Sequence, residues 1–171
     1  MTATASDAAL AEYIARIEAE PARAAVTLTV GSDCPDAFRC DTTMRKHAMV
    51  IDEPKRLGGT DEGPSPVDLA LAALASCQAI TYRVWAHRLG IELGRVQVEV
   101  SGDLDQRGFF GTEEGVRAGY GALRVRVSCE GPETQERYRE LAEIVDQHCP
   151  LLDMYTNPVP VERVLVQPAA E

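Results

Sequence analysis

The chain has 171 residues, 45% of them apolar and 26% charged, which is the composition of a folded domain with a core of its own. Its 27 acidic residues outnumber its 17 Lys and Arg residues, giving a formal net charge of -10, and the basic residues form no run. Phosphate backbones and anionic lipids repel such a chain. We therefore expect no nucleic-acid partner and no membrane partner.

The N-terminal sequence and the cysteine count indicate the compartment. The first 20 residues carry acids and lack a continuous apolar stretch, so they do not resemble a signal peptide. The longest apolar run, Leu69 to Ala75, is far shorter than the ~20 residues of a membrane-spanning helix. Five cysteines, an odd number, favour thiols that the cell keeps reduced. We expect a cytoplasmic protein in which any disulfide is transient.

In chain order, the first predicted element is a helix over residues 7–18, whose apolar positions follow helical spacing. Apolar residues alternate with threonine over residues 26–30, which predicts a half-buried strand that ends at the following glycine. Residues 38–51 predict a weaker strand or a pair of strands. Residues 52–65 are rich in Gly and Pro and predict a long loop, and loops of this length often border a site.

A long helix is predicted next. Ser65 has the position of an N-cap, Pro66 that of the first helical residue, and Asp68 that of the acid that completes a capping box. We expect the helix to continue to Leu89. Residues 69–77 are apolar on nearly every side, so other elements or a partner subunit must surround the first half of this helix.

The rest of the chain returns to strands and one more helix. Alternating apolar residues predict strands at 96–104 and 123–129, each with one buried and one exposed face, as in an antiparallel sheet. Residues 106–122 predict a loop. Residues 134–149 have helical spacing, and residues 159–166 predict a last strand.

The chemistry of the chain depends on its cysteines, because a thiolate is a strong nucleophile. Cys129 lies on the apolar face of a strand and is interpreted as a core residue. Cys34 and Cys40 are the first and last residues of the segment CPDAFRC. The sequence has no second cysteine pair at a suitable spacing to complete a zinc tetrad, so we interpret these two cysteines as having no chemical role. Cys77 and Cys149 remain, and either could be a reactive thiol or a buried structural cysteine.

The surroundings of these two cysteines differ from those of the other three. Cys77 follows the apolar run at the point where the long helix becomes mixed in polarity. Cys149 precedes Pro150, in the N-cap position of a further short turn, where backbone N–H groups favour a negative charge. His148 could act as a base, could complete a zinc site with both thiols, or could be a hydrogen-bonded core residue.

Two separated motifs resemble the OsmC/Ohr family, specifically its OsmC-like branch. They are GGTDEGPSPVDLALAALASC at residues 58–77 and HCPLLDMYTNPVPV at residues 148–161, and the DEP and GIELGRVQVEVSGDLD segments are also similar. The resemblance covers the chain from about residue 38 onward. We expect residues 1–35 to form an N-terminal helix and first-strand extension, and residues 36–171 to form the OsmC-like domain, within a single folded unit.

The resemblance implies an α+β fold of the OsmC-like type, with antiparallel sheets around long central helices in an intertwined homodimer. It also implies a peroxidase, an oxidoreductase of oxidative stress defence that reduces organic hydroperoxides. In that scheme Cys77 is the redox-active cysteine that becomes a sulfenic acid, and Cys149 resolves it as a Cys77–Cys149 disulfide. An external dithiol then reduces the disulfide. No metal and no cofactor are implied.

The sequence departs from the family at one position. Well-known members support the thiolate with an Arg and Glu pair, in which the Glu directly follows a proline, but Val67 stands there in this chain. Asp68 is next to it and is interpreted mainly as a helix cap, and Arg45 is the candidate arginine. A non-catalytic protein that holds a small hydrophobic or thiol ligand at the dimer interface is the alternative function.

Overall fold

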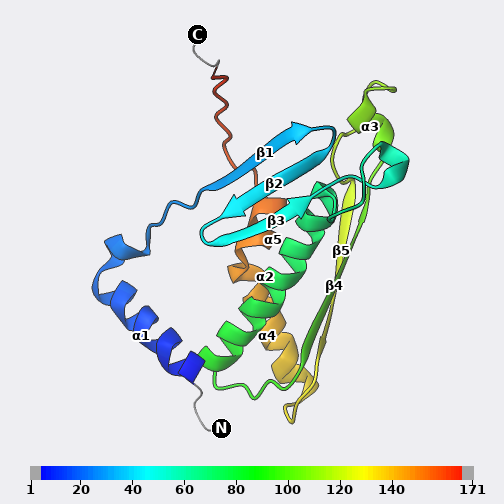
Figure 1. Cartoon of the computed structure of the whole chain (residues 1–171). Helices are drawn as coiled ribbons and strands as arrows, with labels where there is room; N and C mark the ends of the chain where they lie inside the picture. Colours follow the sequence, from blue (N-terminus) through cyan, green and yellow to red (C-terminus); the bar gives the residue numbers. More distant parts are fainter. Residues whose placement is uncertain (1–4, 167–171) are drawn as a thin grey trace.

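Two antiparallel sheets and a long helix, α2 (Pro66–Arg88), form the framework of the computed structural model, which describes residues 5–166 (Figure 1). The sheets have the strand orders β1-β2-β3 and β4-β5. Their strands are β1 (Val30–Asp36), β2 (Arg39–Met44), β3 (His47–Ile51), β4 (Val96–Asp103) and β5 (Ala122–Cys129). The expected α+β class with antiparallel sheets is confirmed.

The N-terminal segment contains the predicted helix but not the predicted strand. Helix α1 (Ala5–Ala19) is followed by the short 3-10 helix η1 (Pro21–Ala24) and lies to one side of the molecule (Figure 1). The strand predicted at residues 26–30 is wrong, because β1 begins only at Val30, where it pairs with the last residue of β2. Residues before Val30 have no strand opposite them. The division of the chain at residue 35 stays a prediction.

The region predicted as one strand or two is a hairpin of two strands, β2 and β3. Met44 pairs with His47, so Arg45 and Lys46 form a two-residue turn. Arg45 has a φ of 55°, the left-handed conformation that such a tight turn requires. This sharp turn keeps β3 in register along the whole of β2.

The segments after β4 differ from the sequence prediction at two places. The predicted loop 106–122 contains a short helix, α3 (Gln106–Phe110), whose N-cap Asp105 accepts a hydrogen bond from the Arg107 amide at 3.0 Å. The last strand, predicted at residues 159–166, is absent from the described structure. These residues leave the body of the protein in an extended path after α5 (Figure 1). A strand forms only beside another strand, and none lies next to this segment.

Helix α2 begins with the predicted capping box. Ser65 Oγ accepts a hydrogen bond from the Asp68 amide at 3.3 Å, and Asp68 Oδ2 accepts one from the Ser65 amide at 3.3 Å. The helix packs against β4 and against helices α4 (Gln135–His148) and α5 (Pro150–Thr156). The core cluster consists of Tyr82, Ala86, Ile91, Leu141 and Val145.

The first half of α2 is not enclosed within one chain. In this half Leu74 is buried but Ala72 and Ala73 are exposed, and just past the middle of the helix Ile80 is 63% exposed. By length and composition alone α2 could also cross a membrane, a test that core helices of soluble folds pass as well. The uncovered apolar surface therefore needs either a partner or another apolar environment.

The loop before α2 is built around a buried carboxylate. Asp52 accepts hydrogen bonds from the amides of Glu53, Thr60 and Glu62 at 2.8, 2.9 and 3.2 Å, and from the Thr60 hydroxyl at 2.6 Å. Gly59 fits against the Glu53 carbonyl, where a Cβ atom would lie 1.8 Å from the oxygen. The Thr60 hydrogen bond and these amides lower the pKa of Asp52 to about 2. The carboxylate thus fixes the chain path into α2.

Replacing Asp52 with Asn should make stability less dependent on pH in acid. The folded pKa lies below the ordinary value, so the stabilisation from Asp52 is complete above that value and disappears as the pH falls toward about 2. We expect the Asp52→Asn chain to melt at a lower temperature than the unmodified chain at pH 7, with the difference closing between about pH 4 and pH 2. Thermal melts followed by circular dichroism measure this.

The exposed Asp146 provides the matched control. The Asp146→Asn chain should lose stability in acid as the unmodified chain does. A gap between the Asp52→Asn and unmodified chains that stays constant down to pH 2 would contradict the role given to the carboxylate.

Candidate active site

Two cysteines that are 72 residues apart in the sequence meet at the side of α2. Cys77 lies in the middle of α2 and Cys149 in the link between α4 and α5, and their Sγ atoms are 3.6 Å apart. Cys149 is 1% exposed and Cys77 is half-buried, and both are free thiols. A disulfide needs an S–S distance of about 2.05 Å, so a shift of roughly 1.5 Å would join them.

The link between α4 and α5 holds Cys149 in this position. The residue has an extended backbone, with φ of -82° and ψ of 112°, and Pro150 begins α5 immediately after it. The sharp change of direction lets α5 pack against α2, where the Tyr155 hydroxyl donates to the Ala70 carbonyl at 3.0 Å. This contact determines the position along the α2 axis at which Cys149 lies.

Opposing effects act on the Cys77 thiol. Burial is the largest and raises its pKa, and the neighbouring Cys149 thiol raises it further. The Leu151 amide lowers the pKa by hydrogen bonding to the sulfur, and the Thr81 hydroxyl, which can turn from the Cys77 carbonyl to a thiolate, lowers it to a smaller extent. The net result is a raised pKa, so the protonated thiol is the resting form in this chain.

An amide at the start of α5 acts on Cys77, and not on Cys149 as expected from the sequence. The sequence placed the N-terminal amides of this turn next to Cys149, but the Leu151 amide contacts the sulfur of Cys77. Thr81 was missed as a site residue although it lies four positions after Cys77, on the same face of α2. Its hydroxyl also donates to the Cys77 carbonyl at 2.8 Å.

Two of the candidate supporting residues lie elsewhere. Asp68 is occupied by the capping box, where it also accepts from the Ser65 hydroxyl at 2.6 Å. Arg45 is exposed in the hairpin turn of β2 and β3, and neither residue is among the groups that shift the pKa of Cys77. Within one chain the expected Arg and acid support of the thiolate is therefore not assembled.

His148 packs against α2 and does not join the thiols. Its Nδ1 lies 2.8 Å from the Ile144 carbonyl oxygen, and its ring stacks on Trp85 with centroids 4.2 Å apart. Over residues 5–166 no group of three His, Cys, Asp or Glu side chains is arranged to hold a metal ion. The structure gives the hypothesis of a zinc site at Cys77, Cys149 and His148 no support.

A hollow with a volume of about 470 Å³ lies between α2, α5 and β5 with the segment before it, and its lining residues include neither Cys77 nor Cys149. Leu74, one turn before Cys77, forms part of its wall, as does Leu152, which follows the amide donor Leu151. Tyr120 and Tyr155 also line it, and both direct their hydroxyls to carbonyls of the first turns of α2. The hollow can accept an apolar group close to the sulfur atoms.

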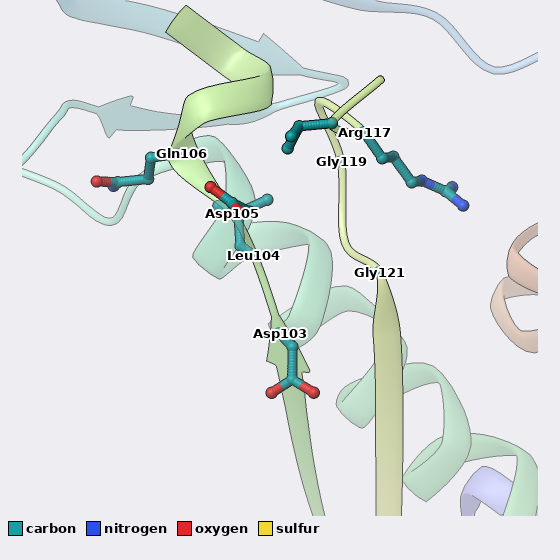
Figure 2. A pocket seen from close by; sticks show the side chains of 8 residues that line it. Asp103, Leu104, Asp105, Gln106, Arg117, Gly119 and Gly121 are labelled. Carbon is teal, nitrogen blue, oxygen red and sulfur yellow. The ribbon is translucent and has the colours of Figure 1, made fainter. Parts of the chain in front are cut away.

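A second hollow, of about 610 Å³, lies between the end of β4, α3 and the segment before β5 (Figure 2). Asp103 and Asp105 line it, and both carboxylates are paired with arginines, Arg124 and Arg107. Figure 2 shows Arg117 extending away from these carboxylates. Both acids of this hollow are paired, and none of its lining residues lies within one helical turn of Cys77 or Cys149, so it is not a candidate for the same chemistry.

Comparison with known proteins gives one family. The model of the family described as OsmC-like protein matches residues 59–163. An OsmC-like protein from Mycoplasma pneumoniae has a similar structure, with a TM-score of 0.67 and 16% identity over 78% of this chain and 89% of that chain. Among curated proteins, none matches the sequence.

Two further structures have the same fold. One is an organic hydroperoxide resistance protein OsmC from Legionella pneumophila, with a TM-score of 0.58 and 19% identity over 75% of this chain and 88% of that chain. The other is an organic hydroperoxide resistance protein from Elizabethkingia anophelis, with a TM-score of 0.61 and 18% identity over 78% of this chain and 91% of that chain.

Replacing Thr81 with Val should raise the pKa of Cys77 further, because the substitution removes a hydroxyl that favours the thiolate. A hydrogen bond worth about 1 kcal/mol corresponds to a roughly fivefold lower thiolate fraction, and hence to roughly fivefold slower alkylation of Cys77 by iodoacetamide at neutral pH. Peptide mass mapping follows the alkylation of Cys77 separately from the other thiols.

The Thr81→Ser chain retains the hydroxyl and is the matched control, which should react at the rate of the unmodified chain. Equal alkylation rates in the Val and Ser chains would show that the hydroxyl does not act on the thiol.

Proposed function

Because the chain belongs to the OsmC-like protein family, we propose that it is a thiol-dependent peroxidase that reduces organic hydroperoxides. The observation that carries the proposal is the 3.6 Å separation of the Cys77 and Cys149 sulfur atoms. Such a pair can store two electrons as thiols and release them by forming one disulfide. The similar proteins named for organic hydroperoxide resistance support this choice of substrate.

The reaction has three steps. The thiolate of Cys77 attacks one oxygen of the O–O bond, which forms a sulfenic acid and releases the other oxygen as an alcohol once it gains a proton. The Cys149 thiol then attacks the sulfenic sulfur, which forms the disulfide and releases water. An external dithiol reduces the disulfide and returns both residues to thiols.

The surroundings of Cys77 fit an apolar substrate. The hollow beside Leu74 and Leu152 would hold the alkyl group of the hydroperoxide and bring its O–O bond to the sulfur. The Leu151 amide and the Thr81 hydroxyl stabilise the thiolate during the attack. The redox chemistry needs no metal and no cofactor in this scheme, and we place the protein in oxidative stress defence in the cytoplasm.

One observation favours the alternative, a binding protein without turnover. The pKa of Cys77 is raised, and no cation is among the groups that act on this thiol within the described chain. A buried thiol that stays protonated reacts slowly with peroxides. The same hollow would then hold a small hydrophobic or thiol ligand.

We propose that the protein is a homodimer. Helix α2 presents exposed apolar residues, Ala72 and Ala73 in its first half and Ile80 just past its middle, and the segment after α5 exposes Val161 at 85% and Leu165 at 87%. Burying a large apolar side chain stabilises an assembly by about 1.5 to 3 kcal/mol. A second copy would cover α2 and could also supply the charged residues that Cys77 lacks within one chain.

Peroxidase activity should be measurable with tert-butyl hydroperoxide and a dithiol. We expect the unmodified chain to remove the peroxide, the Cys77→Ser chain to lose this activity because it lacks the nucleophile, and the Cys149→Ser chain to accumulate a sulfenic acid on Cys77. Loss of peroxide and trapping of the sulfenic acid with dimedone are the two measurements.

The Cys129→Ser chain is the matched control, since this thiol packs against the core and should not take part. If the unmodified chain removes peroxide no faster than the Cys77→Ser chain, the peroxidase proposal is wrong. Saturable binding of the hydroperoxide without its reduction would then support the binding protein.

The dimer proposal predicts a mass of about twice 18.6 kDa in light scattering after size-exclusion chromatography. Replacing Ile80 with Asp puts a charge into the proposed interface and should shift the protein toward the monomer. Phe109 on α3 is also exposed, at 68%, so Phe109→Asp is the matched control and should remain dimeric. A monomeric unmodified chain would rule out the homodimer.

A further inference from the structure

A second pair of cysteines, Cys34 and Cys40, lies on the hairpin of β1 and β2, in a different part of the chain from Cys77 and Cys149. Asp33 on β1 pairs with Asp41 on β2, and the register shifts before Asp36. Asp36 pairs with Arg39, so Cys34 and Cys40 both lie between these two paired positions, on opposite strands at the end of the hairpin. Neighbouring strands lie about 4.7 to 4.9 Å apart, so the two Cα atoms can come within the range that a disulfide spans.

The side chains of this pair also meet. Cys34 Sγ lies 3.8 Å from the Ala37 carbonyl oxygen in the turn between the two strands, and the nearby Cys40 thiol is the main influence that raises the pKa of Cys34. Cys34 is exposed and Cys40 is half-buried, so solvent and small molecules reach the pair. Buried structural cysteines usually pack among apolar side chains. Here the neighbours of Cys34 include the acids Asp33 and Asp36, which is not the environment of a core thiol.

We propose that Cys34 and Cys40 form a second, reversible disulfide that is separate from the Cys77 and Cys149 pair. The oxidant is a small-molecule disulfide of the glutathione type. The Cys34 thiolate attacks its S–S bond and releases one thiol, and Cys40 then attacks the Cys34 sulfur of the mixed disulfide and releases the second. Two electrons and two protons pass from the chain to the external disulfide, and an external dithiol reverses the reaction.

The surroundings of the pair suit slow thiol–disulfide exchange. The hydrogen bond with Cys40 and the charges of Asp33 and Asp36 raise the pKa of Cys34, so the thiol stays protonated at neutral pH. Once Cys34 carries a mixed disulfide, the adjacent Cys40 sulfur is already in place to close the ring. The pair therefore responds to the thiol–disulfide balance of its surroundings.

The hairpin end that carries this pair is joined to the loop before α2. Arg39, next to Cys40, donates to Glu62 Oε2 at 2.9 Å, and the Phe38 ring lies against Gly58. Glu62 in turn donates its amide to the buried Asp52. Closing the disulfide thus fixes a turn that contacts the segment leading into the helix of Cys77.

The experiment uses the full chain with Cys77→Ser and Cys149→Ser, which leaves three cysteines. After incubation with glutathione disulfide, we expect the free thiols to fall from three to one, and a dithiol to restore all three. Free thiols are blocked before digestion. Trypsin cleaves after Arg39, between the two cysteines, so the disulfide appears as linked peptides 24–39 and 40–45.

Two controls make the result specific. Adding Cys34→Ser should abolish the linked peptides and leave a glutathione adduct on Cys40, whereas adding Cys129→Ser should leave the link intact. Mixing isotope-labelled and unlabelled chains before oxidation shows whether the disulfide forms within one chain or between two chains. A disulfide within one chain joins only peptides that carry the same label.

Three results would each overturn the proposal. The first is glutathione on Cys34 and Cys40 separately without closure of the ring, the second is both thiols remaining free, and the third is a link between labelled and unlabelled chains. Since the catalytic pair is absent from this chain, the outcome is independent of whether the protein reduces peroxides.

Discussion

The packing of α5 against α2 determines what this protein can do chemically. Pro150 turns the chain immediately after Cys149, and the Tyr155 hydroxyl holds α5 to the Ala70 carbonyl. This arrangement brings the Cys149 sulfur to Cys77 and points the Leu151 amide at the same atom. If α5 moved along α2 by even one helical turn, about 5.4 Å, both contacts would disappear.

Placing two thiols side by side in an apolar environment disfavours the charged thiolate form of Cys77. Burial raises the pKa of Cys77, and two neutral donors, the Leu151 amide and the Thr81 hydroxyl, offset only part of the effect. The acids near the start of α2 do not help, because Asp52 and Asp68 hold the loop and the helix cap. This is the physical reason why a charged group from a second subunit would matter to the proposed reaction.

Three apolar segments of the chain, residues 26–29, residues 159–166 and the first half of α2, lack the neighbours that would cover them. The segments at residues 26–29 and 159–166 alternate in polarity like strands, yet neither pairs with a strand in the described chain. Part of the apolar surface of the first half of α2 is exposed as well. A strand needs hydrogen-bond partners and an apolar helix needs cover. The proposed dimer would meet both needs, and the hairpin with Cys34 and Cys40 adds a redox-sensitive element outside the catalytic pair.

The sequence by itself determined the local features: the capping box at Ser65 and Asp68, the length of α2 and the two cysteine motifs. These depend on neighbouring residues only. The tertiary structure alone decided that the Leu151 amide faces Cys77 and not Cys149, that Arg45 is a turn residue, and that residues 159–166 remain unpaired. Each of these depends on how distant segments pack, because the direction of an amide and the partner of a strand are set by elements far away in the sequence.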